Sequence, residues 1–173
     1  MKARSLFPLV MMVCLGMNGM AATTRYVVSP ETPGANPVGD YTSWETAATN
    51  IQTAITASVN GDTILVSNGV YYLTAEIELT KNIVLRSYGD GDIDPNGTIL
   101  DAQYPTYSNR CMYVNNASAQ VEGFTFTNGF PQADSLNGDG GGLYLQGSAK
   151  AKSCYFLGNR ASRNGGGVFI NYG

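Results

Sequence analysis

Three aspartates at alternating positions, Asp90, Asp92 and Asp94, form the densest group of candidate metal ligands in the chain. Alternating carboxylates followed by an amide, with Asp101 at the twelfth position, match the start of a calcium-binding loop. Two features count against calcium: Pro95 stands where an EF-hand turn requires glycine, and the closing bidentate glutamate is missing. The alternative is a solvated turn between two strands, where Asp, Asn, Gly and Pro are common.

Other carboxylates lie on or near expected strands and could take part in polysaccharide chemistry. Hydrolysis of a glycosidic bond needs two carboxylates held a defined distance apart across the sugar. The sequence alone does not pair any two of the candidates. They are Glu76, Glu78, Asp101 and Glu122.

Two isolated arginines, Arg86 and Arg110, could supply the basic residue of a lyase, or could form ordinary surface ion pairs. The chain has no histidine, which excludes His-based catalytic triads and most zinc sites. The glycine-rich run at 138–142 is not followed by a helix pattern, so it is not a nucleotide-binding motif. We therefore assign no catalytic residue from the sequence.

Tyrosine is the commonest aromatic residue, with 11 in the chain. Tyrosines exposed on one face could stack on sugar rings, whereas the alternative is packing among the strands, to which tyrosine is well suited. The candidates are Tyr71, Tyr72, Tyr88, Tyr104, Tyr107 and Tyr113.

Residues 1–22 have the features of a signal peptide. Lys2 and Arg4 form a basic start, and residues 6–17 form an apolar run too short to span a bilayer comfortably. We expect cleavage after Ala21 or Ala22, with a retained membrane anchor as the alternative. The remaining chain has 8 basic and 13 acidic residues, a net charge of −5 that disfavours nucleic-acid binding. The prediction is an exported protein without a membrane span or a nucleic-acid partner.

Two cysteines, Cys111 and Cys154, remain in the mature chain. Export would permit a disulfide, but the internal repeat does not bring the two residues to equivalent positions. We expect buried free thiols, with a disulfide as the alternative.

Residues 23–62 are expected to form a cap, with a short strand at 25–29, a loop at 30–41 and then a helix. Thr42 and Glu45 fit a capping box, which predicts that the helix begins at Thr42. An apolar stripe on this helix would cover the open end of a stack of strands. Its members recur at helical spacing: Trp44, Ala47, Ala48, Ile51, Ala54 and Ile55.

Residues 63–173 contain short β-branched runs bounded by turn residues, which predict short strands. Residues 112–114 match 143–145 at an offset of 31, and residues 140–145 recur as 165–170 at an offset of 25. Repeats of this length are typical of a solenoid, in which inward side chains of successive turns lie over one another. The expected apolar column consists of Val114, Leu145 and Ile170.

The offset of 31 also predicts a second set of equivalent positions. It aligns Phe124 with Tyr155 and Phe126 with Leu157. It also aligns Asn128 with Asn159, and we expect these two amides to form a hydrogen-bond ladder at a turn.

Parts of the chain resemble known families. The segments 51–55 (IQTAI), 61–66 (GDTILV) and 69–71 (GVY) resemble the N-terminal cap and first coil of pectin-lyase-like proteins. Residues 154–161 (CYFLGNRA), followed by three glycines at 165–167, resemble the repeat of the polymorphic outer-membrane protein family. The resemblance implies an all-β fold, a right-handed parallel β-helix (solenoid) with an N-terminal amphipathic capping helix.

The resemblance also implies a place and a role for the protein. We expect a module that is extracellular or on the outer-membrane surface, adhesin- or passenger-like and non-catalytic, contacting a polysaccharide or a surface protein. The alternative is a polysaccharide lyase, glycoside hydrolase or pectin esterase-like enzyme whose site lies mostly outside this chain. The sequence stops inside a repeat, so we expect a fragment truncated at the C-terminus. No cofactor is expected beyond the calcium that Asp90, Asp92 and Asp94 could bind.

Overall fold

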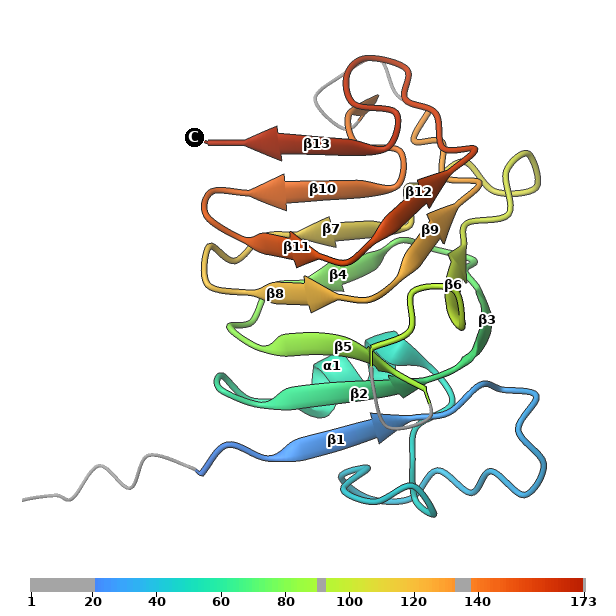
Figure 1. Cartoon of the computed structure of the whole chain (residues 1–173), viewed down its shortest axis with the longest axis vertical. Helices are drawn as coiled ribbons and strands as arrows, with labels where there is room; N and C mark the ends of the chain where they lie inside the picture. Colours follow the sequence, from blue (N-terminus) through green and yellow to red (C-terminus); the bar gives the residue numbers. More distant parts are fainter. Residues whose placement is uncertain (1–20, 90–92, 133–137, 173) are drawn as a thin grey trace, which may run out of the picture.

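The structure, a computed structural model, describes residues 21–89, 93–132 and 138–172, and its strands pair in three parallel sheets (Figure 1). Sheet A contains β1 (Thr24–Val27), β2 (Thr63–Ser67), β5 (Val84–Tyr88), β8 (Gln120–Glu122) and β11 (Lys150–Lys152). Sheet B contains β3 (Gly69–Tyr72), β6 (Thr98–Asp101), β9 (Thr125–Thr127) and β12 (Tyr155–Leu157). Sheet C contains β4 (Ile77–Leu79), β7 (Met112–Val114), β10 (Leu143–Gln146) and β13 (Val168–Asn171).

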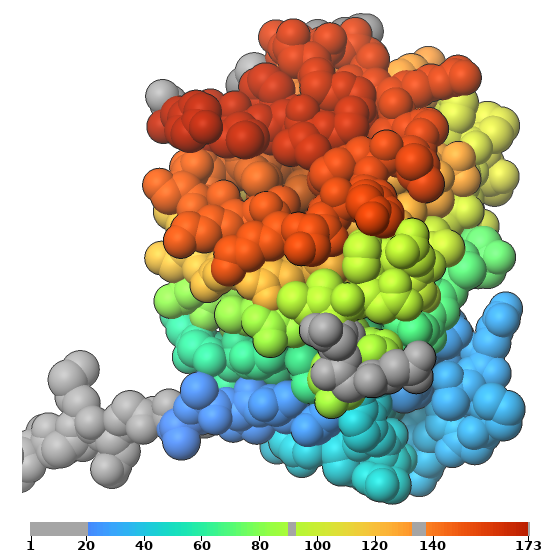
Figure 2. Space-filling model, in the orientation of Figure 1, coloured from blue at the N-terminus to red at the C-terminus, as the bar shows by residue number. Residues whose placement is uncertain are grey.

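From β2 onward the chain visits sheets A, B and C in turn, and one such pass is called a circuit below. The four circuits are β2–β4, β5–β7, β8–β10 and β11–β13. Each strand of the second and third circuits, three to five residues long, pairs with its counterparts in both neighbouring circuits and is held on both sides. Figure 2 shows the N-terminal segment, in blue, at the bottom of this stack and the last circuit, in red, at its top.

Inward side chains of sheet C form the predicted apolar column. Val114 pairs with Leu145, Leu145 pairs with Ile170, and Leu79 of the first circuit extends the column below Val114. Leu79, Val114 and Leu145 are buried, while Ile170 in the last described strand is exposed. Each fully buried aliphatic side chain contributes about 1.5–3 kcal/mol, so the column is a main source of stability.

The predicted alignment of sheet B is wrong by one residue. Tyr155 pairs with Thr125 and Phe156 with Phe126, an offset of 30 rather than 31. The connection from sheet C to sheet A is the cause: Gln120 follows Met112 by eight residues, whereas Lys150 follows Leu143 by seven. The shift puts the rings of Phe126 and Phe156 on one another, with centroids 5.1 Å apart.

The two turn asparagines also depart from the predicted ladder. The amide of Asn159 donates to the carbonyl of Phe126 (2.8 Å) and accepts from the N–H of Gly129 (2.9 Å). Asn128 instead donates to the carboxylate of Asp101 in the preceding circuit (3.0 Å). The amides therefore link neighbouring circuits through other groups, because the one-residue shift offsets the two positions.

The predicted start of the helix is wrong. Helix α1 spans Ile51–Ala57, and its N-cap is Asn50, whose side chain accepts from the N–H of Thr53 at 3.1 Å. Ala48, two residues before the N-cap, forms a bridge to β1 instead: its N–H donates to the carbonyl of Tyr26, and its carbonyl accepts from the N–H of Val28, just after β1. Backbone pairing with a strand therefore replaces the helical turn that the capping-box pattern predicts.

The predicted apolar stripe is confirmed only in part: five of its six residues are buried, and Trp44 is not. Ile51, Ala54 and Ile55 of α1 are buried in the core, as are Ala47 and Ala48 ahead of it. Trp44 lies outside the helix and is 37% exposed, with its ring against Tyr26 and Tyr88 at centroid distances of 4.6 and 5.9 Å.

A buried ion pair anchors β1 to the turn that follows α1. Asp62 accepts hydrogen bonds from the Arg25 guanidinium (3.0 Å), from the N–H of Thr23 (2.8 Å) and from the N–H of Val59 (3.0 Å). Arg25 also donates to the carbonyl of Asp40 at 2.6 Å. Burial raises the pKa of Asp62, but these hydrogen bonds and the Arg25 charge outweigh it and hold the pKa below its ordinary value.

The two cysteines do not form the disulfide considered as an alternative. Cys111 and Cys154 are free thiols; Cys111 is buried and Cys154 half-buried. Burial raises the pKa of Cys111 to about 12, which makes the thiol unreactive at neutral pH.

Residues 1–20 of the predicted signal peptide lie outside the described residues. Across the described ranges, no helix has the length and apolar character needed to cross a bilayer.

Candidate functional site

The connections from sheet B to sheet C carry most of the long loops in the fold. They are residues 73–76, 102–111, 128–142 and 158–167 in the four circuits. The connections from sheet A to sheet B have one or two residues, except for 89–97 in the second circuit. Loops held on a rigid stack are where binding residues concentrate, so this corner is the candidate site.

A hollow of about 500 Å³ lies at this corner, where loops of three successive circuits meet. Residues 74–76 of the first circuit, 108–110 of the second and 131–132 of the third line it, together with Glu78 of β4. A smaller hollow of about 160 Å³ shares residues 74–76 and reaches the start of α1. The two hollows therefore adjoin along the direction in which the circuits stack.

Glu76 and Arg110 form an ion pair in the larger hollow, with 2.9 Å between the guanidinium and the carboxylate. The Arg110 side chain is only 5% exposed, and its guanidinium lies over the rings of Tyr113 and Tyr144, 5.5 and 5.2 Å from their centroids. Burial raises the pKa of Glu76; the Arg110 charge opposes this, and the Glu78 carboxylate adds to it. The pair thus joins the first two circuits at the floor of the site.

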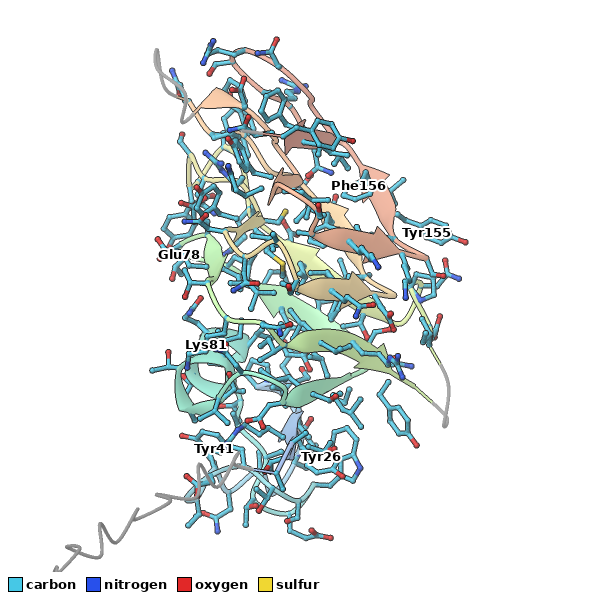
Figure 3. The ribbon with its side chains drawn as sticks, turned by 90° about the vertical axis from the view of Figure 1, so that its left-hand side faces the viewer. Tyr26, Tyr41, Glu78, Lys81, Tyr155 and Phe156 are labelled. Atoms are coloured by element: carbon cyan, nitrogen blue, oxygen red, sulfur yellow. The ribbon has the colours of Figure 1, made fainter. Side chains whose placement is uncertain are left out.

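Glu78 is held at the rim of the hollow by α1. Gln52 of the helix accepts from the N–H of Glu78 (2.8 Å) and donates to its carbonyl (3.2 Å). These two bonds fix the backbone of β4 while its outward side chain stays exposed. Figure 3 shows Glu78 projecting from one side of the molecule and Tyr155 from the opposite side.

An aromatic column runs along the outward face of sheet C beside the hollow. Glu78, Tyr113, Tyr144 and Phe169 occupy matching positions in the four circuits. The ring centroids of Tyr113 and Tyr144 are 4.9 Å apart, and those of Tyr144 and Phe169 are 5.2 Å apart. Tyr113 therefore packs against its neighbours, which is the packing alternative rather than an open sugar platform.

The other candidate tyrosines do not share one surface. Tyr71 is buried and donates to the carbonyl of Ser67, Tyr88 packs on Trp44, and Tyr104 meets Phe130 edge-on. Tyr72 and Tyr107 are exposed, at 57% and 37%. Of these two, Tyr107 directly precedes the hollow-lining segment 108–110.

Two of the candidate carboxylates serve the stack rather than the hollow. Asp101 accepts from the N–H of Gln103 (2.7 Å) and from Asn128 (3.0 Å), so it stabilises a turn. Glu122 on β8 is buried between Arg86 and Lys152, the residues aligned with it on the neighbouring strands of sheet A. Arg86 thus forms a surface ion pair, one of the two roles considered for it.

The Glu122 cluster makes stability depend on pH. Burial raises the pKa of Glu122, but the hydrogen bonds and charges of Lys152 and Arg86 outweigh it and hold the pKa below 4.5. A lowered folded pKa adds stability that is present above 4.5 and is lost as pH falls through the folded value. We expect Glu122→Gln to cost about 1 kcal/mol at neutral pH, with the difference from the wild type shrinking as the pH falls through the folded pKa. Urea unfolding from neutral to acid pH measures this, and a difference that does not change with pH would contradict the assignment.

The predicted calcium loop falls only partly within the described residues, because Asp90 and Asp92 lie outside them. Asp94 accepts from the N–H of Asn96 (3.0 Å) and from the amide of Asn68 (3.4 Å), as expected for a turn residue. Within residues 21–89, 93–132 and 138–172, no group of three or more acidic, Cys or His side chains is placed to hold a metal ion. Calcium binding stays a prediction.

Sequence reasoning named Glu76, Glu78 and Arg110 singly but did not bring them together. It missed the contribution of Tyr144 and of the amides at Asn109 and Gln132. The Tyr144 signal was available, because Tyr144 is the aligned partner of Tyr113 in the offset of 31. The chain matches no protein-family model, no curated protein and no solved structure.

Proposed function

We propose that this chain is an exported, right-handed parallel β-helix module that binds a glycan in the hollow at the sheet B–sheet C corner without cleaving it. The cyclic order of the strands through three parallel sheets supports the β-helix. The signal-peptide features of residues 1–22 support export to the extracellular space or the outer-membrane surface.

One observation carries the binding role: three successive circuits each contribute polar groups to one hollow of about 500 Å³. Carboxylates come from the first circuit, an amide and a hydroxyl from Asn109 and Ser108 of the second, and an amide from Gln132 of the third. Sugars carry many hydroxyl groups that both donate and accept, so a mixed set of this kind suits them better than an apolar ligand. A flat partner protein would use little of a concave surface.

A second function is favoured by the carboxylates themselves. Glu76 and Glu78 line the same hollow, and burial raises the pKa of Glu76, as a general acid in glycoside cleavage requires. Against this, Glu76 is paired with Arg110 at 2.9 Å, and the cation opposes protonation of the carboxylate. We therefore place binding before cleavage.

A panel of soluble polysaccharides, with and without calcium, tests both functions. Binding is measured by affinity electrophoresis of the purified mature protein, and cleavage by new reducing ends or unsaturated products.

We expect binding without products and about a 3–10-fold loss of affinity in Gln132→Ala, which removes one hydrogen-bonding amide. Asn96→Ala, an exposed amide on another turn, is the control and should bind as the wild type does. Product formation would favour the enzyme, and binding to no glycan would contradict the proposal.

A further inference from the structure

The lining of the larger hollow has more negative than positive side chains, and the excess negative charge lies on the side that a ligand meets. Glu76, Glu78 and Arg110 are its charged lining residues, and the remaining lining residues are uncharged. Arg110 is 5% exposed, and its guanidinium lies between the Glu76 carboxylate and two tyrosine rings. The cation is therefore committed to the floor of the hollow, while Glu78 is exposed at the rim.

The lining holds two carboxylates and one guanidinium, so one negative charge, that of Glu78, is left over after the Glu76–Arg110 pair. Burial raises the pKa of Glu76, Arg110 lowers it, and the Glu78 charge raises it. Burial and Tyr144 raise the pKa of Tyr113, Arg110 lowers it, and the charges of Glu76 and Glu78 raise it. An ammonium group placed beside Glu78 would relieve the repulsion between the two carboxylates, whereas a carboxylate there would increase it.

We infer that the hollow selects a glycan with protonated amino groups, a chain of 2-amino-2-deoxy sugars, and rejects polyuronates. This inference rests on the proposed glycan binding and names its ligand class. The ammonium group would lie against Glu78, and the sugar hydroxyls would meet Ser108, Asn109 and Gln132. Polyuronates, the ligands that a resemblance to pectin-lyase-like proteins would suggest, carry the wrong charge for this site.

Three hexasaccharides separate the possibilities: glucosamine, N-acetylglucosamine and galacturonate oligomers, titrated calorimetrically into the mature protein at pH 6 and low salt. The first two differ in charge but share the sugar ring. We expect the glucosamine hexamer to bind at least about 10-fold more tightly than the acetylated one, with the difference shrinking at high salt. The galacturonate hexamer should not bind measurably.

Glu78→Gln should lose about 10-fold in affinity for the glucosamine hexamer and leave binding of the acetylated hexamer unchanged. Glu31→Gln removes the same charge from an exposed loop residue, so it controls for attraction of any polycation to a chain of net charge −5. A thermal melt of each variant confirms folding. Equal losses in the two variants, or equal affinity for the two hexamers, would overturn the amino-sugar inference while glycan binding stands. Failure of all glycans would overturn both.

Discussion

Gly141→Ala should destabilise the protein by at least about 3 kcal/mol, seen as a fall of about 6–12 °C in Tm. A Cβ atom on Gly141 would overlap the carbonyl oxygens of Arg160 and Gly166 in the next circuit. Backbone carbonyls of a paired circuit cannot rotate away as a side chain can, so the circuits themselves would have to separate. The same segment leads into β10, whose pairing to β7 and β13 would then be disturbed.

Gly166→Ala is the matched control, because Gly166 is the counterpart of Gly141 25 residues later. Its added Cβ would meet one tight contact, the carbonyl oxygen of Asn159 at 3.2 Å, and ordinary contacts beyond that. We expect a change within about 1 kcal/mol for this variant. Differential scanning calorimetry compares the two. If both variants melt together, close approach of circuits at this corner is not what requires glycine at position 141.

The same glycine runs explain why sheet C was predictable from the sequence. The runs at 140–142 and 165–167 precede apolar–aromatic–apolar triplets, and that pattern set the offset of 25 that the strand pairing has. Close backbone packing and alternation of side chains both leave strong marks in the sequence. Val114, Leu145 and Ile170 accordingly lie on neighbouring strands.

Sheet B was aligned wrongly because a change in turn length leaves almost no mark. Counted between aligned residues, the path from sheet C to sheet A is one residue shorter before β11 (Leu143 to Lys150) than before β8 (Met112 to Gln120), and both turns contain small and polar residues. The predicted alignment places Phe124 with Tyr155 and Phe126 with Leu157, which are all hydrophobic residues. The true alignment of Phe126 with Phe156 is no better in hydrophobicity, so composition does not reveal the shift of one residue. The helix start was predicted wrongly for a related reason: the capping pattern at Thr42 is local, whereas the pairing of Ala48 with β1 is not.

The candidate site was the least predictable part. Glu76 and Arg110 are 34 residues apart and meet only because sheet C places Ile77, one residue after Glu76, beside Met112, two residues after Arg110. The loop conformations that bring Gln132 to the same hollow depend on the third circuit. A list of titratable residues therefore contained the correct side chains without their arrangement.

The second large effect is expected at the cap, where Asp62→Ala should cost about 3–5 kcal/mol. The substitution removes an acceptor used by Arg25, Thr23 and Val59, and it leaves the 7%-exposed Arg25 guanidinium without its carboxylate. Because β1 is the outermost strand of sheet A, its amides should lose hydrogen-exchange protection before those of β2 and β5. Thermal melts and hydrogen exchange measure the two parts of this prediction.

Two further variants separate loss of the ion pair from loss of a side chain. Asp40→Ala removes an exposed carboxylate but keeps the backbone carbonyl that Arg25 contacts at 2.6 Å, so it should change stability by less than about 0.5 kcal/mol. In Arg25→Met with Asp62→Ala, no buried charge is left uncompensated, so the double variant should be more stable than Asp62→Ala alone. A double variant no more stable than the single one would mean that Asp62 acts through the N–H groups of Thr23 and Val59 rather than through Arg25. In that case the cap is held by hydrogen bonds to the backbone, and neutralising Arg25 would leave β1 as protected as before.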